Sequence, residues 1–260
     1  MNILEKIIES KKKSLREKKD WYSIKKLEAS PDFDRECESL VKRLNNSDTT
    51  GIIAEFKRRS PSKGIINDKA DITDVVSSYE NYGAAGISVL TDEEYFGGSN
   101  EDLIKAREAV DIPILRKDFI IDEYQVIEAK SIGADLILLI AACLTPAEVK
   151  RLTGIAKNLG LEVLLELHGE EELGHICNNV DMVGVNNRNL KTFEVDINTS
   201  LKLVDKIPTG KPAITESGIS SVDSIVALRQ AGFKGFLIGE TFMKEADPGK
   251  AFAEFVTGLK

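Results

Sequence analysis

The chain has 260 residues, of which 42% are apolar and 30% are charged, a composition typical of one globular domain with a sizeable core. Its formal net charge of −8 argues against bulk binding to nucleic acid or to an anionic membrane surface. No apolar stretch approaches the roughly 18 residues of a membrane helix, and residues 1–19 lack the apolar core of a signal peptide. We therefore expect a cytoplasmic protein.

The first 48 residues predict helices. Apolar residues with helical spacing occur at Ile3, Leu4, Ile7 and Ile8, and again at Cys37, Leu40, Val41 and Leu44. A basic run comprises Lys11, Lys12, Lys13, Arg16, Lys18 and Lys19. This run could attract anions, but we interpret it as a solvated helix face. We expect residues 1–48 to be a helical extension packed on a catalytic domain formed by residues 49–260.

From Gly51 onward, a short apolar strand, a polar loop and an amphipathic helix recur eight times. The predicted strands are Ile52–Phe56, Gly86–Leu90, Ile112–Arg116, Leu136–Ile140, Glu162–Leu167, Met182–Val185, Lys211–Thr215 and Gly235–Ile238. The predicted helices are Ile72–Tyr82, Asn100–Ala109, Glu123–Ile132, Pro146–Leu159, Glu170–Ile176, Thr199–Val204, Val222–Ala231 and Pro248–Val256. A doubly wound open sheet would also fit, but eight equal units without a glycine-rich dinucleotide turn favour a closed barrel. The predicted fold class is α/β, a (β/α)₈ barrel with an N-terminal helical extension.

Charged and amide side chains stand at the C-terminal ends of five predicted strands. In the first strand, Ile52, Ala54 and Phe56 share the face toward the helices, so Glu55 and Lys57 face the barrel interior. The same register places four more polar side chains inside, namely Lys117, Glu166, Asn186 and Glu216. Active sites of such barrels lie at this end, and burial of an unpaired charge costs several kcal/mol. Together these residues indicate catalysis rather than structural ion pairs.

Two glycine-containing loops predict a phosphate site. Ser217 and Gly218 follow the seventh strand and Gly239 follows the eighth, where such barrels often bind phosphate through loop amides. Glycine lets the backbone approach an anion, Ser217 adds a hydroxyl donor and Lys57 a point charge. The first loop alone is equally consistent with a turn and a helix N-cap, and its pairing with Gly239 favours phosphate.

We expect no metal and no cofactor. No cysteine or histidine cluster has metal-ligand spacing, and no P-loop or nucleophile elbow is present. Of the two histidines, His168 could approach the site, but we interpret it as a loop or core residue. Cys37, Cys143 and Cys177 are widely spaced and odd in number, which indicates a reducing compartment without disulfides. We interpret Cys143 as a small buried apolar residue.

Several segments resemble the signatures of indole-3-glycerol-phosphate synthases. The most specific is residues 53–62, IAEFKRRSPS, and others are residues 90–99, 115–120, 165–166, 184–190 and 215–219. The resemblance covers essentially the whole chain, including the N-terminal extension. It implies a carbon–carbon lyase of tryptophan biosynthesis that uses no cofactor. The implied reaction converts 1-(2-carboxyphenylamino)-1-deoxyribulose 5-phosphate to indole-3-glycerol phosphate, carbon dioxide and water.

The resemblance also implies roles for individual residues. Lys117 resembles the main general acid, Glu166 its partner in acid–base work and Lys57 a second catalytic lysine, while Glu55, Asn186 and Glu216 complete the catalytic set. The implied substrate-binding residues are Ser60, Pro61, Leu90, Phe96, Phe119, Leu138, Arg188, Ser217, Gly218, Ile219, Gly239 and Glu240. Among them, the apolar wall around the anthranilate ring consists of Pro61, Leu90, Phe96, Phe119 and Leu138.

Glu240 departs from the family pattern, since many members have serine at this position. An anionic side chain beside a phosphate is unfavourable, but if the backbone N–H of Glu240 makes the contact, its carboxylate can point to solvent. We therefore keep the phosphate site and assign no side-chain role to Glu240. The glutamates inside the barrel and the phosphate and carboxylate of the substrate place several negative charges close together. We expect their repulsion to raise the pKa of at least one glutamate.

Three other functions remain open. The first is a Schiff-base aldolase with Lys117 as nucleophile, against which the aromatic wall and the Glu55/Lys57 pair argue. The second is an enzyme like phosphoribosylanthranilate isomerase, which would share the phosphate site but would not need that pair or the extension. The third is a non-catalytic binding protein, which leaves the interior charges unexplained. We expect a small phosphorylated substrate and neither nucleic acid nor membrane as partner; association with other tryptophan-pathway enzymes stays open.

Overall fold

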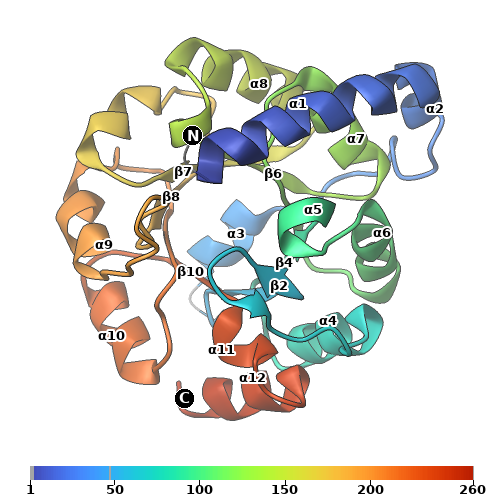
Figure 1. Cartoon of the computed structure of the whole chain (residues 1–260). Coiled ribbons are helices and arrows are strands. Elements are labelled where there is room, and N and C mark those ends of the chain that lie inside the picture. The colour runs from blue at the N-terminus through green and yellow to red at the C-terminus, as the bar shows by residue number, and fades with distance from the viewer. Residues whose placement is uncertain (1–2, 47, 260) are drawn as a thin grey trace.

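A computed structural model describes residues 3–46 and 48–259. Eight parallel strands close into a barrel in the order β1-β10-β9-β8-β7-β6-β5-β4, surrounded by helices (Figure 1). The strands are β1 (Ile52–Phe56), β4 (Gly86–Leu90), β5 (Ile114–Lys117), β6 (Leu136–Ile140), β7 (Glu162–Leu167), β8 (Met182–Asn186), β9 (Ala213–Glu216) and β10 (Gly235–Ile238). The expected (β/α)₈ barrel is confirmed.

Helices cover the outside of the barrel. They are α4 (Ile72–Asn81), α6 (Asn100–Ala109), α7 (Glu123–Ser131), α8 (Pro146–Asn158), α9 (Asn198–Leu203), α10 (Val222–Gln230) and α12 (Pro248–Thr257). Most begin at a side chain that accepts a backbone N–H of the first turn, and Asp122 and Thr145 form complete capping boxes. Within the described ranges, no helix combines the length and the hydropathy needed to cross a bilayer.

Short elements lie between these units. They are the hairpin of β2 (Arg59–Ser60) and β3 (Gly64–Ile65), the helices α5 (Glu93–Phe96) and α11 (Glu240–Met243), and the 3₁₀ turns η1 (Ala141–Cys143), η2 (Glu170–His175) and η3 (Val204–Lys206). The segment of η2 was predicted as an α-helix, which is wrong. Gly169 and Gly174 lower the helix propensity of this short segment, and 3₁₀ geometry is common in short pieces.

The strand side chains form two separate cores. Ile52, Ala54 and Phe56 pack against the helix layer, whereas Ile53 packs inside the barrel, as the alternation predicted. The interior core also contains Leu115, Leu136, Leu138, Ile140, Leu164, Met182, Ile214 and Leu237. These apolar side chains fill the barrel below the mouth, so the polar residues that follow them along the strands emerge at its C-terminal end.

Two strands begin two residues later than predicted. Pro113 directly precedes β5 and Pro212 directly precedes β9. Proline has no N–H to give to the sheet, so each ladder starts after it. At the other end, β5, β8 and β9 continue one residue further than predicted, so that Lys117, Asn186 and Glu216 are the last residues of their strands.

The N-terminal segment contacts both ends of the barrel. Helix α1 (Ile3–Trp21) lies over the C-terminal end (Figure 1, dark blue), and Ile3, Leu4 and Ile7 line the cavity there. Helix α2 (Ile24–Glu28) follows, and α3 (Leu40–Asn45) covers the opposite end, where Leu40 and Leu44 join the interior core. The expected segments 1–48 and 49–260 include positions 1–2, 47 and 260, which lie outside the described residues.

The basic face of α1 is not simply solvated. Lys11 Nζ lies 2.8 Å from Asp92 Oδ2 and 2.8 Å from Asp118 Oδ1, both of which are buried at the rim of the barrel. Two further ion pairs join Lys18 to Glu128 at 3.5 Å and Lys19 to Asp122 at 2.8 Å. The prediction of a solvated face was therefore wrong for Lys11, which pairs with carboxylates that are distant in the sequence, whereas the side chains of Lys18 and Lys19 remain 42% and 43% exposed.

Candidate active site

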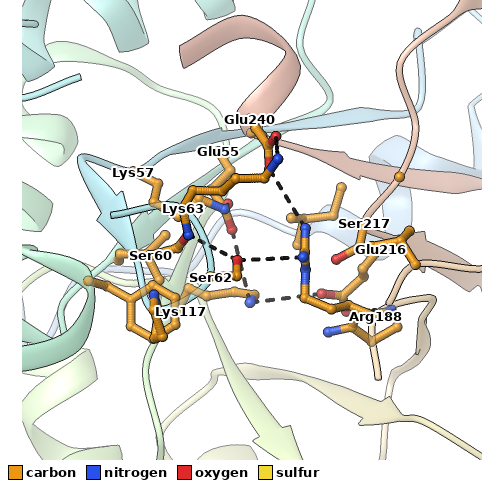
Figure 2. Close-up of a pocket in the computed structure, with 18 of the residues that line it drawn as sticks. Glu55, Lys57, Ser60, Ser62, Lys63, Lys117, Arg188, Glu216, Ser217 and Glu240 are labelled. Carbon is orange, nitrogen blue, oxygen red and sulfur yellow. Dashed lines mark hydrogen bonds and ion pairs between the residues drawn. The ribbon is translucent and has the colours of Figure 1, made fainter. Parts of the chain in front are cut away.

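The six predicted catalytic residues line a single cavity at the C-terminal end of the barrel. Its volume is about 520 Å³, and it is bordered by Glu55, Lys57, Lys117, Glu166, Asn186 and Glu216. Figure 2 shows the first three and Glu216 among the side chains around it. They come from β1, β5, β7, β8 and β9 and the loop after β1. The sequence register thus brings these residues together, although their roles stay predictions.

Two ammonium groups face three carboxylates inside this cavity. Lys117 Nζ lies 3.9 Å from Glu166 Oε2, 3.9 Å from Glu216 Oε2 and 4.0 Å from Glu55 Oε2. Lys57 Nζ lies 2.6 Å from Glu55 Oε1. Lys117 is therefore the central cation, held between carboxylates from three strands.

Two glycines make room for these carboxylates because they have no side chain. A Cβ atom at Gly184 would lie 2.5 Å from Oε1 of Glu216, and one at Gly239 would lie 2.5 Å from Oε1 of Glu55. Both distances are far below van der Waals contact, so any larger residue would displace a carboxylate. Gly239 thus serves the charge cluster as well as the predicted phosphate loop.

The predicted phosphate loops border the other side of the cavity. The backbone φ angles of Ser217 and Gly218 are 69° and 79°, a left-handed conformation that is uncommon for serine and found often at functional sites. Within the described chain, the N–H groups of Gly218, Ile219 and Gly239 donate no hydrogen bond. These donors are therefore available to an anion in the cavity.

The side chain of Glu240 is 38% exposed, and its carboxylate also lies near two cations. Its Oε1 lies 3.3 Å from Lys63 Nζ, and its Oε2 lies 3.6 Å from Nη2 of Arg188 (Figure 2). Arg188 also reaches Ser62 Oγ at 3.5 Å. The sequence did not predict the contact with Lys63, because the β2–β3 turn that carries this lysine is far away in the sequence. Ser60 also lines the cavity from β2.

The apolar wall is present, with one correction. Pro61, Leu90, Phe96 and Phe119 line the cavity, and the rings of Phe96 and Phe119 lie 6.0 Å apart. Leu138 does not reach it: its side chain is buried in the interior core. Ile140 lines the cavity instead, because it is two residues nearer the C-terminal end on the same face of β6.

Comparison with known proteins decides the family. The family model for indole-3-glycerol phosphate synthase matches residues 4–255. The chain belongs to the indole-3-glycerol phosphate synthase family. The indole-3-glycerol phosphate synthase of Bacteroides thetaiotaomicron is 48% identical over 259 residues, which cover 100% of this chain and 99% of that protein. That of Laribacter hongkongensis is 44% identical over 257 residues, 97% of this chain and 98% of the relative.

Solved structures with low sequence identity share the fold. A mutant tryptophan synthase α-subunit from Pyrococcus furiosus superposes with a TM-score of 0.61 at 17% identity, over 80% of this chain and 96% of that chain. Thiamine phosphate pyrophosphorylase from the same organism gives 0.60 at 17% identity, over 85% and 99%. These likenesses concern the barrel alone. Membership of the indole-3-glycerol phosphate synthase family confirms the decarboxylating lyase that the motifs predicted.

The charge cluster of the cavity separates the pKa values of two glutamates. Burial and the facing carboxylate of Glu166 raise the pKa of Glu216 well above its ordinary value. Burial also opposes the ionisation of Glu166, but Lys117 and His168 lower its pKa to about 2. Burial disfavours the charge of Lys117 too, yet the three carboxylates raise its pKa above the ordinary value. The cluster therefore favours the protonated form of Glu216 and the charged forms of Glu166 and Lys117.

Several residues of the cavity were not predicted from the sequence. Ile3, Leu4 and Ile7 of α1 line it, and so does Lys63 of the β2–β3 turn. His168 lies behind Glu166, with Nε2 3.2 Å from Glu166 Oε1. The helical spacing of the isoleucines indicated an apolar face but not what that face covers. Lys63 belongs to no periodic pattern, so no signal in the sequence placed it. The position of His168 after the fifth strand indicated that it could approach the site, but not that its ring contacts Glu166.

Proposed function

We propose that the cavity binds 1-(2-carboxyphenylamino)-1-deoxyribulose 5-phosphate and converts it to indole-3-glycerol phosphate with the residue roles given below. The observation that carries the proposal is the contact of Lys117 with three carboxylates beside a loop pair with free N–H donors. This arrangement supplies proton donors and acceptors at fixed points next to a site for an oxyanion.

Each part of the substrate has a matching part of the cavity. The phosphate meets the N–H groups of Gly218, Ile219 and Gly239, with the hydroxyl of Ser217 and the guanidinium of Arg188 nearby. The aromatic ring lies against Phe96 and the other residues of the apolar wall. Its carboxylate pairs with the ammonium of Lys57. Held at both ends, the substrate folds so that the ring carbon approaches the ribulose carbonyl carbon.

Ring closure needs a proton on the carbonyl oxygen. Lys117 donates it while the ring carbon that bears the carboxylate forms the new bond to the carbonyl carbon. The surrounding carboxylates raise the pKa of Lys117, which keeps it protonated at neutral pH before the step. The closed intermediate carries a positive iminium nitrogen, which the ionised carboxylates of Glu55 and Glu166 stabilise.

Loss of carbon dioxide leaves its bonding electrons in the ring system and neutralises the iminium. The new hydroxyl then departs as water. A proton from Lys57 or Glu216 assists its departure, and ionised Glu166 accepts the proton that is lost from the adjacent carbon. Asn186 lines the cavity beside these groups and orients the intermediate. The apolar wall excludes bulk water and thereby strengthens each electrostatic contact.

Incubation of the purified protein with the carboxyphenylamino-deoxyribulose phosphate tests the proposal. We expect indole fluorescence and one carbon dioxide for each substrate consumed. Borohydride added during turnover should leave no covalent adduct on Lys117. Substrate binding without indole formation, or an adduct on Lys117, would favour the binding protein or the Schiff-base aldolase instead.

A further inference from the structure

A buried histidine connects a catalytic glutamate to a second carboxylate. His168 follows β7, and its side chain is 13% exposed. Its Nε2 lies 3.2 Å from Oε1 of Glu166, and its Nδ1 lies 3.6 Å from Oε2 of Glu172. The backbone N–H of His168 donates to the same oxygen of Glu172 at 2.6 Å, which holds the ring between the two carboxylates.

The ring lies outside the cavity. Glu166 lines the cavity, whereas His168 lies behind it and is absent from the lining of the described chain. Neither ring nitrogen makes a well-aligned hydrogen bond within the described residues. The contacts with the glutamates are ion pairs when the ring is protonated, so their strength depends on the charge of the ring.

We propose that His168 is a positioning residue which, as an imidazolium between Glu166 and Glu172, fixes the Glu166 carboxylate at the barrel mouth and keeps it ionised as the proton acceptor. The inference rests on the role of Glu166 in the proposed function, and it adds the residue that sets this role. His168 acts on the substrate only through Glu166.

The groups around these side chains support a charged ring. Burial alone would lower the pKa of His168, but Glu166 and Glu172 raise it to about 10. Glu166 is faced by Lys117 from β5, by Glu216 from β9, by Glu55 from β1 and by Cys143 from η1. Burial and the two neighbouring glutamates raise the pKa of the Cys143 thiol, so it stays neutral and adds no charge.

The histidine distinguishes two otherwise similar glutamates. Glu166 and Glu216 both contact Lys117 at 3.9 Å. Glu166 has a second cation, the imidazolium of His168. Within the described chain no second cation pairs with Glu216, so Glu216 is the carboxyl group whose protonated form is favoured. Two carboxyl groups whose environments separate their pKa values are typical of an acid and a base in one site. His168 thus decides which of the two is the base.

The variant His168→Gln tests the role of the charge, because it keeps an N–H donor but cannot be protonated. Without the imidazolium the pKa of Glu166 rises, so the ionised form is lost at a higher pH. We expect the acid limb of the kcat profile to move upward by about one pH unit, with kcat lower by about tenfold and KM nearly unchanged. A purely structural role would not move this limb.

His175→Gln is the matched control. His175 lies in the same segment, but among the described residues its ring nitrogens hydrogen-bond to backbone carbonyls alone, that of Glu172 at 3.0 Å and that of Leu144 at 2.9 Å. We expect its pH profile to equal that of the wild type. An unshifted acid limb in His168→Gln, or the same shift in both variants, would overturn the inference.

A readout independent of turnover is the titration of the ring by nuclear magnetic resonance. The chain has two histidines, so His168 is assigned by the signal that the variant loses. We expect it to titrate well above the ordinary value of about 6.5, and at lower pH in Glu172→Gln. Titration at or below the ordinary value would overturn the inference.

A double-mutant cycle separates the inference from the proposed function. Because His168 acts through Glu166, adding His168→Gln to Glu166→Gln should cause little further loss of kcat. An additive loss would overturn the inference and leave the proposed function intact. Full turnover by Glu166→Gln alone would instead remove Glu166 from the proposed function, and the role of His168 with it.

Discussion

Lys117 is the side chain on which the proposed chemistry depends most. It ends β5 and lies within 4.0 Å of three carboxylates, which keep it protonated. Lys117→Met fills a similar volume without a proton to donate. We expect the variant to fold and to lose turnover by about 100-fold or more. Steady-state kinetics and circular dichroism check these two expectations.

Lys130 provides the control for this substitution. It is also a buried lysine, but it lies away from the mouth, donates to the carbonyl of Arg35 and contacts Sγ of Cys37 at 3.1 Å. Lys130→Met should lower the unfolding temperature, because it leaves the half-buried carbonyl of Arg35 without this donor. Its turnover per folded molecule should stay normal. Equal turnover in both variants would remove Lys117 from the acid role.

The raised pKa of Glu216 predicts a second ionisation in the pH profile. Burial and Glu166 raise this pKa well above its ordinary value, so the acid form persists to higher pH than in a free glutamate and is lost as the pH rises through the raised pKa. We expect kcat/KM to fall at a pH well above the ordinary glutamate value of about 4.3. Glu216→Gln should remove this ionisation. A profile without any step above the ordinary range would contradict the prediction.

For single residues, the sequence predicted the side chains whose positions follow from the alternation along a strand. Strand alternation places Glu55 and Glu166 inside the barrel, and strand polarity places them at the mouth. Depth along the barrel axis depends on strand stagger, which no period reveals, and so Leu138 was expected where Ile140 lies. His168 lies in a loop, and only the folded chain brings its ring to Glu166.

Helix α1 is the element that joins the N-terminal segment to the mouth. Lys11 pairs with Asp92 and Asp118, and the apolar residues one and two turns earlier line the cavity. Lys11→Met should loosen this contact. We expect faster amide hydrogen exchange along α1 and a higher KM, since Ile7 and its neighbours no longer border the substrate.

Lys13→Met is the control for Lys11→Met, since Lys13 is exposed on the same helix. It should leave both the exchange of α1 and the KM unchanged. Unaltered exchange in Lys11→Met would show that the ion pairs do not hold the helix. Hydrogen-exchange mass spectrometry measures both variants under one set of conditions.

The bounds of several long elements were predicted from the sequence, whereas the shortest elements were not predicted at all. Helix α6 and strand β7 have the predicted bounds, because a full period of apolar residues specified them. The β2–β3 hairpin, α5 and α11 have two to four residues per element. Such segments contain too few residues to show a period, and their conformation depends on contacts with other parts of the chain.

For the whole molecule, Asp118 predicts a loss of stability in acid. Burial opposes its ionisation, but Lys11 and Arg116 lower its pKa to about 2 from 3.8. The unfolded chain therefore takes up this proton first, and stability is lost as the pH falls from about 3.8 toward 2. At neutral pH the contribution to the free energy of unfolding is on the order of 2 kcal/mol.

Asp118→Asn tests this contribution. The variant should be less stable than the wild type at neutral pH, and the difference should shrink as the pH falls through the stated window. Urea unfolding at a series of pH values measures the free energy. A difference that stays constant from neutral pH to pH 2 would contradict the linkage.

We propose that residues 1–48 act as an extension that brackets the barrel formed by residues 49–260. Helix α1 borders the mouth, and α3 seals the opposite end with Leu40 and Leu44. At that end, the carboxylate of Glu162 accepts the N–H of Leu40 at 2.9 Å. The sequence predicted the extension but not its two contact sites, because both depend on residues far along the chain.

The order of synthesis along the chain determines when residues 1–48 can pack on the barrel. The extension is synthesised before the barrel, so its partners Asp92, Asp118 and Glu162 are all made later. Until β7 has emerged, α3 lacks the Glu162 carboxylate that accepts an N–H of its first turn, and its leucines have no closed barrel to pack into. Helices α1 and α3 therefore remain without their packing partners, and accessible to chaperones, until the strands that they cover have been synthesised.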